Sequence, residues 1–211
     1  MTHLSETLDS AAFTARLRQA AEHIQSRTDW LSQLDAAVGD GDHGVTMGRV
    51  CEAILTTLAA PPADDLAALC GAVGWAVMCT DGGSTSPLFG SFLTGIGDGL
   101  TPPTPLTTMA LARAFDAGLT NLRRQTSAKP GDKTMVDALV PAVAALQRAA
   151  TDGATIATAL SAAATAAAAG AEATRPLKAA FGRARNLGER TVGHLDPGAA
   201  SVALFFEGFA Q

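Results

Sequence analysis

Three aspartates lie close together in one glycine-rich stretch of the sequence. Asp35, Asp40 and Asp42 are separated by small residues and glycines, and His43 follows directly. Clustered carboxylates repel one another unless a cation neutralises them, and their hard oxygens match Mg²⁺. The glycines allow backbone angles that let the turn carboxylates point inward. The spacing predicts a magnesium site, and the alternative is an aspartate-rich helix-capping loop that holds no ion.

A second glycine-rich loop begins at Asp81. Gly82 and Gly83 are followed by the hydroxyl residues Ser84 and Thr85 and then by an apolar segment. Backbone N–H groups in such a loop can cradle a phosphate at the start of a helix. No Gly-Lys-Ser/Thr follows, so the loop is not a Walker A motif. An ordinary connection between helices is the alternative.

Two further polar loops stand later in the chain. In the stretch from Lys129 to Met135, Asp132 is predicted to cap the next helix, and Lys133 either approaches a phosphate or is solvated. The segment 182–198 is long, charged and punctuated by glycine. Its arginines can clamp phosphate oxygens; they are Arg183, Arg185 and Arg190. The alternative is a surface loop with ion pairs through its acidic residues.

The segments between these loops are predicted to be helices. Alanine and leucine dominate, tyrosine is absent, and apolar residues recur at helical spacing. Asp64 or Asp65 is expected to cap the fourth helix, and Pro61-Pro62 to end the third. Short connections favour antiparallel neighbours. We expect one all-α domain over residues 1–211, an antiparallel bundle or barrel of about eight helices. The predicted ranges are 13–24, 30–34, 47–58, 66–77, 88–96, 109–119, 135–146, 156–173 and about 198 onward.

Composition excludes several classes of function. The chain of 211 residues is 47% hydrophobic and 17% charged, with a net charge of -5. An acidic chain without a basic cluster is a poor candidate for binding nucleic acid. The tract Ala157–Ala173 is mainly alanine and has too little leucine, isoleucine and valine for a membrane span. We expect a cytoplasmic protein without a leader, in which Cys51, Cys70 and Cys79 are free thiols.

Taken together, the motifs resemble the nucleotide-binding L domain of the dihydroxyacetone kinase family across nearly the whole chain. They occur in this order: Leu34-Asp-Ala-Ala-Val-Gly-Asp-Gly-Asp-His-Gly44, Gly82-Gly with Pro87-Leu-Phe-Gly90, Pro130-Gly-Asp-Lys-Thr-Met135, Gly182-Arg-Ala, Leu187-Gly-Glu-Arg, Gly193-His and Asp196-Pro-Gly-Ala199. The resemblance implies an all-α barrel with the nucleotide at one end.

The resemblance also implies roles for individual residues. Asp35, Asp40 and Asp42 would hold two Mg²⁺ ions that bridge the phosphates of ADP or ATP. Arg183 would be catalytic, because it can stabilise the transferring phosphoryl group. The nucleotide site would be lined by His43, Gly44, Thr46, Gly83, Ser84, Thr85, Thr134, Met135, Arg183, Asp196 and Pro197.

The family's substrate, dihydroxyacetone, binds on a separate K subunit or domain, so the resemblance implies that partner. Bound ADP would be rephosphorylated in place by a phosphotransferase-system protein. The alternatives are an ATP-dependent subunit for a related ketose such as erythrulose, a nucleotide-bound regulatory adaptor, and a metal-dependent phosphohydrolase. Thr46 stands where the family often has asparagine, and Ser86 where it often has glycine. These two departures leave the acceptor open.

Overall fold

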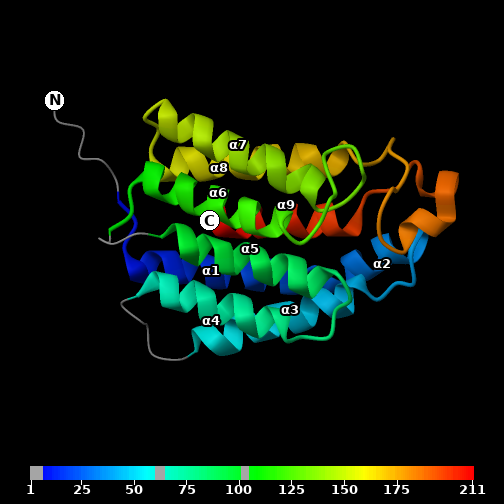
Figure 1. Cartoon of the computed structure of the whole chain (residues 1–211), viewed down its shortest axis with the longest axis horizontal. Coiled ribbons are helices and arrows are strands. Elements are labelled where there is room, and N and C mark those ends of the chain that lie inside the picture. The colour runs from blue at the N-terminus through cyan, green and yellow to red at the C-terminus, as the bar shows by residue number, and fades with distance from the viewer. Residues whose placement is uncertain (1–6, 60–64, 101–104) are drawn as a thin grey trace.

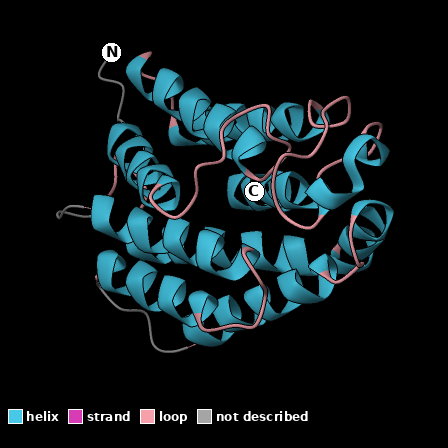
Figure 2. Ribbon diagram, turned by 45° about the vertical axis from the view of Figure 1, so that its right-hand side comes forward, coloured by secondary structure: helices cyan, strands magenta, loops and turns pink. Residues whose placement is uncertain are grey.

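The computed structural model describes residues 7–59, 65–100 and 105–211. These residues form nine α-helices and one 3₁₀-helix, and their only β pairing is an isolated antiparallel bridge between Leu8 and Leu106. The prediction of an all-α fold is therefore confirmed (Figures 1 and 2). The elements are α1 (Ser10–Gln25), α2 (Thr28–Val38), α3 (His43–Leu58), α4 (Leu66–Met78), α5 (Thr85–Gly99), α6 (Thr108–Arg123), α7 (Val136–Thr151), α8 (Ile156–Glu172), η1 (Ala184–Thr191) and α9 (Pro197–Ala210).

Eight of the helices close into a ring. In the order α1, α3, α4, α5, α6, α7, α8, α9, each helix packs against the next, and α9 packs back against α1. Neighbours run antiparallel along the long axis of Figure 1, with α2 at one end of the molecule. There α2 contacts α3, α9 and η1. The predicted antiparallel barrel is thus the observed architecture.

The interior of the ring is built around phenylalanines. Phe205, Phe206 and Phe209 of α9 are each 1% exposed. They meet aromatic rings from three other helices at centroid separations of 5.3 to 5.6 Å, mostly edge to face. These partners are Phe13 of α1, Phe89 of α5 and Phe115 of α6. Such aromatic pairs add to the stabilisation from burial alone, so α9 ties distant parts of the ring together.

Glycines let neighbouring helices approach closely. A Cβ atom on Gly74 of α4 would lie 2.6 Å from the carbonyl oxygen of Gly90, and one on Gly90 of α5 would lie 2.6 Å from that of Gly74. The two backbones are therefore in direct contact where α4 crosses α5. A side chain at either position would push the pair apart.

Several local expectations can now be judged. Asp65 caps α4, because its carboxylate accepts a hydrogen bond from Ala68 N at 3.0 Å. Asp64 and Pro61-Pro62 lie outside the described residues. The capping role predicted for Asp132 is wrong, since its carboxylate accepts from Lys129 N at 2.9 Å instead. None of the described helices combines the length and apolarity needed to cross a membrane.

Candidate functional site

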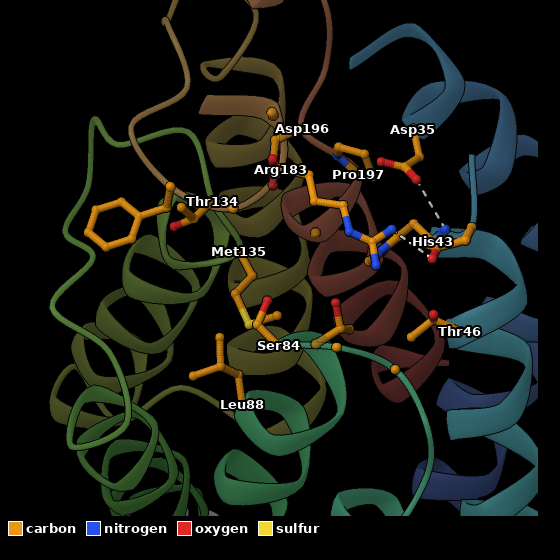
Figure 3. A pocket seen from close by; sticks show the side chains of 18 of the residues that line it. Asp35, His43, Thr46, Ser84, Leu88, Thr134, Met135, Arg183, Asp196 and Pro197 are labelled. Carbon is orange, nitrogen blue, oxygen red and sulfur yellow. Dashed lines mark hydrogen bonds and ion pairs between the residues drawn. The ribbon is translucent and has the colours of Figure 1, made fainter. Parts of the chain in front are cut away.

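One end of the barrel contains a cavity of about 500 Å³ (Figure 3). Because neighbouring helices alternate in direction, α3, α5, α7 and α9 all begin at this end. Their N-cap residues all line the cavity; they are Asp42, Ser84, Met135 and Asp196. The start of each helix carries a partial positive charge, so four such charges meet at one cavity.

The capping of these helices differs between the two ends of the barrel. At the far end, the N-cap side chains of α1, α4, α6 and α8 each accept a hydrogen bond from a backbone N–H three residues on; they are Asp9, Asp65, Thr107 and Thr155. At the cavity, only Asp196 does so, while the N-caps of α3, α5 and α7 make no such bond within the described residues. The first N–H groups of α3 and α7 have other side-chain acceptors, since His43 N donates to Asp35 and Val136 N to Thr134 Oγ1 at 3.2 Å. Further N–H groups at these helix starts can bind an anion, so the cavity suits phosphate.

The three aspartates gather at the rim of the cavity. One carboxylate oxygen from each of Asp35, Asp40 and Asp42 lies within 4.8 Å of the others. Asp35 also accepts a hydrogen bond from His43 N at 3.2 Å. Arg183 pairs with Asp40 and, at 2.8 Å, with Asp42. Three hard oxygen donors grouped in this space are the kind of ligands that Mg²⁺ prefers, and the magnesium site stays a prediction.

His43 joins the starts of two helices. Its side chain is buried, and Nε2 lies 2.8 Å from Ser201 Oγ of α9. Ser201 Oγ donates to Pro197 O at 3.1 Å, so its oxygen is left to accept from His43. Burial lowers the pKa of His43 to about 4, which leaves the ring uncharged at neutral pH. His43 therefore fixes the start of α3 against α9 without adding charge.

The second glycine loop forms a turn at the start of α5. Gly83 has a positive φ of 56°, and Gly82 approaches Ser86 and the side chain of Thr46. Thr46 lines the cavity. Ser86 is fully buried behind the loop, where Thr80 Oγ1 donates to it at 2.7 Å. Of the two departures from the family pattern, only Thr46 therefore faces the cavity.

The third loop is held by Asp137 rather than by Asp132. The Asp137 carboxylate accepts from Gly131 N at 2.6 Å and from Thr134 N at 2.7 Å, which presents Thr134 and Met135 to the cavity. Lys133, expected to be near phosphate or solvated, is 2% exposed, and its ammonium donates to the backbone carbonyls of Thr174 and His194. The alternative of a solvated lysine is wrong.

Asp196 has an unusual environment at the start of α9. Its carboxylate accepts from Ala199 N at 2.7 Å. Burial raises the pKa of Asp196 to about 7, against opposing effects of that hydrogen bond and of Lys133. A carboxyl group with a pKa near neutrality in a cavity is typical of functional sites.

The predicted site residues are largely brought together. All the predicted metal and nucleotide residues except Gly44 line the cavity. Gly44 packs instead against α2, where a Cβ atom would collide with Thr28 O and Ser32. Arg185 and Arg190 of the fourth loop do not line it. No role is predicted from the sequence for part of the apolar lining, even where its residues fall within a motif; this part consists of Val38, Leu88, Ala128, Val136, Phe181 and Ala184.

The family model and the similar curated proteins point to the same family. The model of the DAK2 domain matches residues 37–211. The chain is 32% identical to the ADP-binding subunit DhaL of a PEP-dependent dihydroxyacetone kinase from Escherichia coli (strain K12), covering 90% of this chain and 91% of that one. It is 37% identical to a second such DhaL subunit, from Listeria innocua, covering 92% and 90%.

Longer proteins match over a smaller share of their length. The chain is 37% identical to the human triokinase/FMN cyclase, over 89% of this chain and 32% of that protein. The crystal structure of the dihydroxyacetone kinase from C. freundii in complex with AMP-PNP and Mg²⁺ superposes with a TM-score of 0.75 and 28% identity, over all of this chain and 36% of that one. Sequence and fold thus agree, and the chain belongs to the DAK2-domain family of dihydroxyacetone kinase subunits.

Proposed function

We propose that this chain is the nucleotide-binding L subunit of a dihydroxyacetone kinase. It would transfer a phosphoryl group from a bound magnesium nucleotide to a small ketose held by a separate K subunit. The observation that carries the proposal is that three helix starts whose N-cap side chains make no capping bond meet three clustered aspartates at one cavity. An anion site beside a cation site is what a magnesium polyphosphate requires.

Different residues of the chain would bind the metal, the phosphates and the base of the nucleotide. Asp35, Asp40 and Asp42 would hold Mg²⁺, two ions by family resemblance, and bound metal supplies charge neutralisation at the phosphates. The starts of α3 and α5 would donate backbone N–H groups to phosphate oxygens. The apolar lining near Leu88 and Phe181 suits the base of the nucleotide. Phosphoryl transfer depends mainly on such positioning and charge stabilisation.

Arg183 is the residue proposed to act on the transferring group. Its side chain is 60% exposed and reaches the aspartate rim, so it can meet a phosphate that approaches the metal site. A guanidinium offers several donors in a fixed plane and stabilises charge that develops in the transition state. No general base is needed from this chain, because the acceptor hydroxyl would arrive with the K subunit.

The relatives support one class of phosphoryl donor. Those matched over about nine-tenths of their length include PEP-dependent kinases from E. coli and L. innocua and a PTS-dependent kinase from Lactococcus lactis. These names support a bound ADP that is rephosphorylated in place by a phosphotransferase-system protein. The ATP-dependent alternative, with erythrulose or another ketose as acceptor, is separated from it by the experiment that follows.

The freshly purified chain is heat-denatured, and the released small molecules are chromatographed. Stoichiometric ADP supports the bound-cofactor mechanism, whereas an empty protein that binds added Mg-ATP supports the ATP-dependent one. Calorimetry with Mg-ADP then compares Asp40→Ala with Asp116→Ala, an exposed aspartate of α6 outside the cavity. We expect binding to be lost only in Asp40→Ala. Unchanged affinity in that variant contradicts the proposed metal site.

A further inference from the structure

The segment that carries Arg183 leaves and rejoins the barrel at a hydrogen-bonded neck, and between its ends Ala180 N donates to Asp132 O of the loop before α7 at 3.1 Å. We call residues 175–193 the flap; it leaves the end of α8, includes η1 and returns to α9 (orange, toward α2 in Figure 1). At its neck Gly193 N donates to Arg175 O at 2.7 Å. Just outside, Asp196 N donates to Thr174 Oγ1 at 2.9 Å. The two ends of the flap are thus hydrogen-bonded to each other.

Lys133 ties both ends of the flap to a different part of the site. Its ammonium donates to Thr174 O at 2.7 Å, on the outgoing side of the neck, and to His194 O on the returning side. Lys133 belongs to the loop before α7 and lines the cavity together with the next two residues, Thr134 and Met135. One buried side chain therefore connects the α7 loop with the base of the segment that carries Arg183.

The backbone of Lys133 is unusual as well. It is the one residue other than glycine with a positive φ, 59°, in the parts of the chain that the structure describes. Side chains rarely adopt this region, and such strain persists where surrounding contacts enforce it. Burial disfavours the charged form of Lys133 and lowers its pKa, while the nearby carboxylates of Asp196 and Asp137 favour the charged form. A lysine in this setting is held for its charge and donors rather than for packing.

We propose that Lys133 is a positioning residue that holds the neck of the flap closed and thereby sets Arg183 at the rim of the cavity. Two of its three ammonium donors are engaged by backbone carbonyls, and we infer that it acts on the nucleotide through Arg183. The part of this inference that concerns nucleotide affinity rests on the proposed function. The part that concerns the flap does not.

The first test measures amide hydrogen exchange in the full chain without ligand. Lys133→Met removes the ammonium but keeps most of the side chain's length, and Lys129→Met makes the same change at an exposed position of the same loop. We expect exchange in flap residues 175–193 to rise at least about 10-fold in Lys133→Met, because two buried carbonyls lose a charged donor. Lys129→Met should match the wild type. Unaltered flap exchange in Lys133→Met overturns the inference.

The second test is a double-mutant cycle on Mg-ADP affinity, measured by calorimetry. Arg183→Ala should weaken binding about 10-fold, as expected for one charge-assisted contact with phosphate. Lys133→Met should weaken it by a similar factor alone, yet by less than about 2-fold in the Arg183→Ala background, because both variants remove one effect. If the affinity of the double variant falls by the product of the two single-variant factors, Lys133 does not act through Arg183. A wild type that fails to bind Mg-ADP contradicts the proposed function and leaves the exchange test standing.

A second variant weakens the same neck while keeping the lysine, so the inference can be tested even if Lys133→Met does not fold. Thr174→Val removes the acceptor of Asp196 N, at a residue that is fully buried. If Lys133→Met melts too low to assay, Thr174→Val should reproduce the faster flap exchange and the non-additive loss with Arg183→Ala. Failure of both effects in a folded Thr174→Val protein overturns the inference.

Discussion

Arg183 and a divalent cation would use the same carboxylates. Arg183 pairs with Asp40 and Asp42, two of the three aspartates that can hold a metal. Replacing it by alanine should therefore have effects of opposite sign. Affinity for the bare cation should rise, because the carboxylates are released. Affinity for the magnesium nucleotide should fall, because a donor to phosphate is lost.

The size of the first effect follows from the exposure of the pairs. The side chains of Arg183, Asp40 and Asp42 are 60%, 52% and 55% exposed. Ion pairs this exposed contribute about 0.2–1 kcal/mol each, so the two together amount to about 1 kcal/mol. At about 1.4 kcal/mol per factor of ten, the cation should bind roughly 5-fold more tightly to Arg183→Ala.

Manganese can report this effect, since unbound Mn²⁺ is measured directly by electron paramagnetic resonance. Arg185→Ala is the matched control, because Arg185 is exposed and has no ion-pair partner in the described part of the chain. We expect tighter Mn²⁺ binding only in Arg183→Ala, with weaker Mg-ADP binding in the same protein. If both affinities fall, or if Mn²⁺ affinity is unchanged, Arg183 does not compete for the metal oxygens.

Three further predictions concern the supports of the site and of the barrel. Since burial lowers the pKa of His43 from 6.5 to about 4, the contribution of His43 to stability falls as pH drops from 6.5 to 4; urea unfolding of both proteins should show His43→Gln losing up to about 1.4 kcal/mol less per pH unit than the wild type. Asp137→Ala, which strips two backbone donors of their acceptor, should cost about 2 kcal/mol and weaken Mg-ADP binding, as denaturant titration and calorimetry will show. Gly90→Ala, which forces a Cβ against Gly74 O, should destabilise by about 1–3 kcal/mol, whereas Gly71→Ala, with open space around its Cβ, should stabilise by up to about 1 kcal/mol; equal melting shifts would contradict the packing argument.

Much of the fold could be predicted from the sequence because periodicity reports which face of a helix is buried. Phe13, Leu17 and Ile24 repeat at helical spacing, and all three lie in the core. The alternation of helices with short loops then implies antiparallel neighbours. Closure of the ring is a different matter. It depends on the packing of α9 against both α1 and α8, and no local pattern reports such a long-range contact.

The site is predictable where chemistry forces residues to cluster in sequence. Asp35, Asp40 and Asp42 lie in one loop, and the repulsion among their carboxylates is by itself a signal for a cation. Leu88 and Phe181 escape sequence reasoning because an apolar residue that lines a cavity looks like any core residue. Lys133 is misleading for the opposite reason, since a lysine between turn residues looks solvated. Only the backbone carbonyls of Thr174 and His194, distant in sequence, reveal its role.

The fourth loop shows another limit. Its arginines and glycines indicate a functional or surface segment, but they do not reveal the 3₁₀-helix η1 within it. Gly188 interrupts η1 with a positive φ of 58°, and Ala184 and Leu187 are its only apolar side chains. Short 3₁₀ segments depend on local turns rather than on a buried stripe, and a search for periodicity does not detect them.

The closed ring constrains whether the number of its helices can be even or odd. Because direction alternates around the ring, an even number of members is required for every neighbouring pair to stay antiparallel, and half of the members then start at each end. Insertion of a helical hairpin anywhere in the ring would preserve this balance and add a fifth start at the cavity. Insertion of a single helix between α3 and α9 would force one parallel pair and reverse every later member of the chain, so that the aspartate loop and the start of α9 would lie at opposite ends.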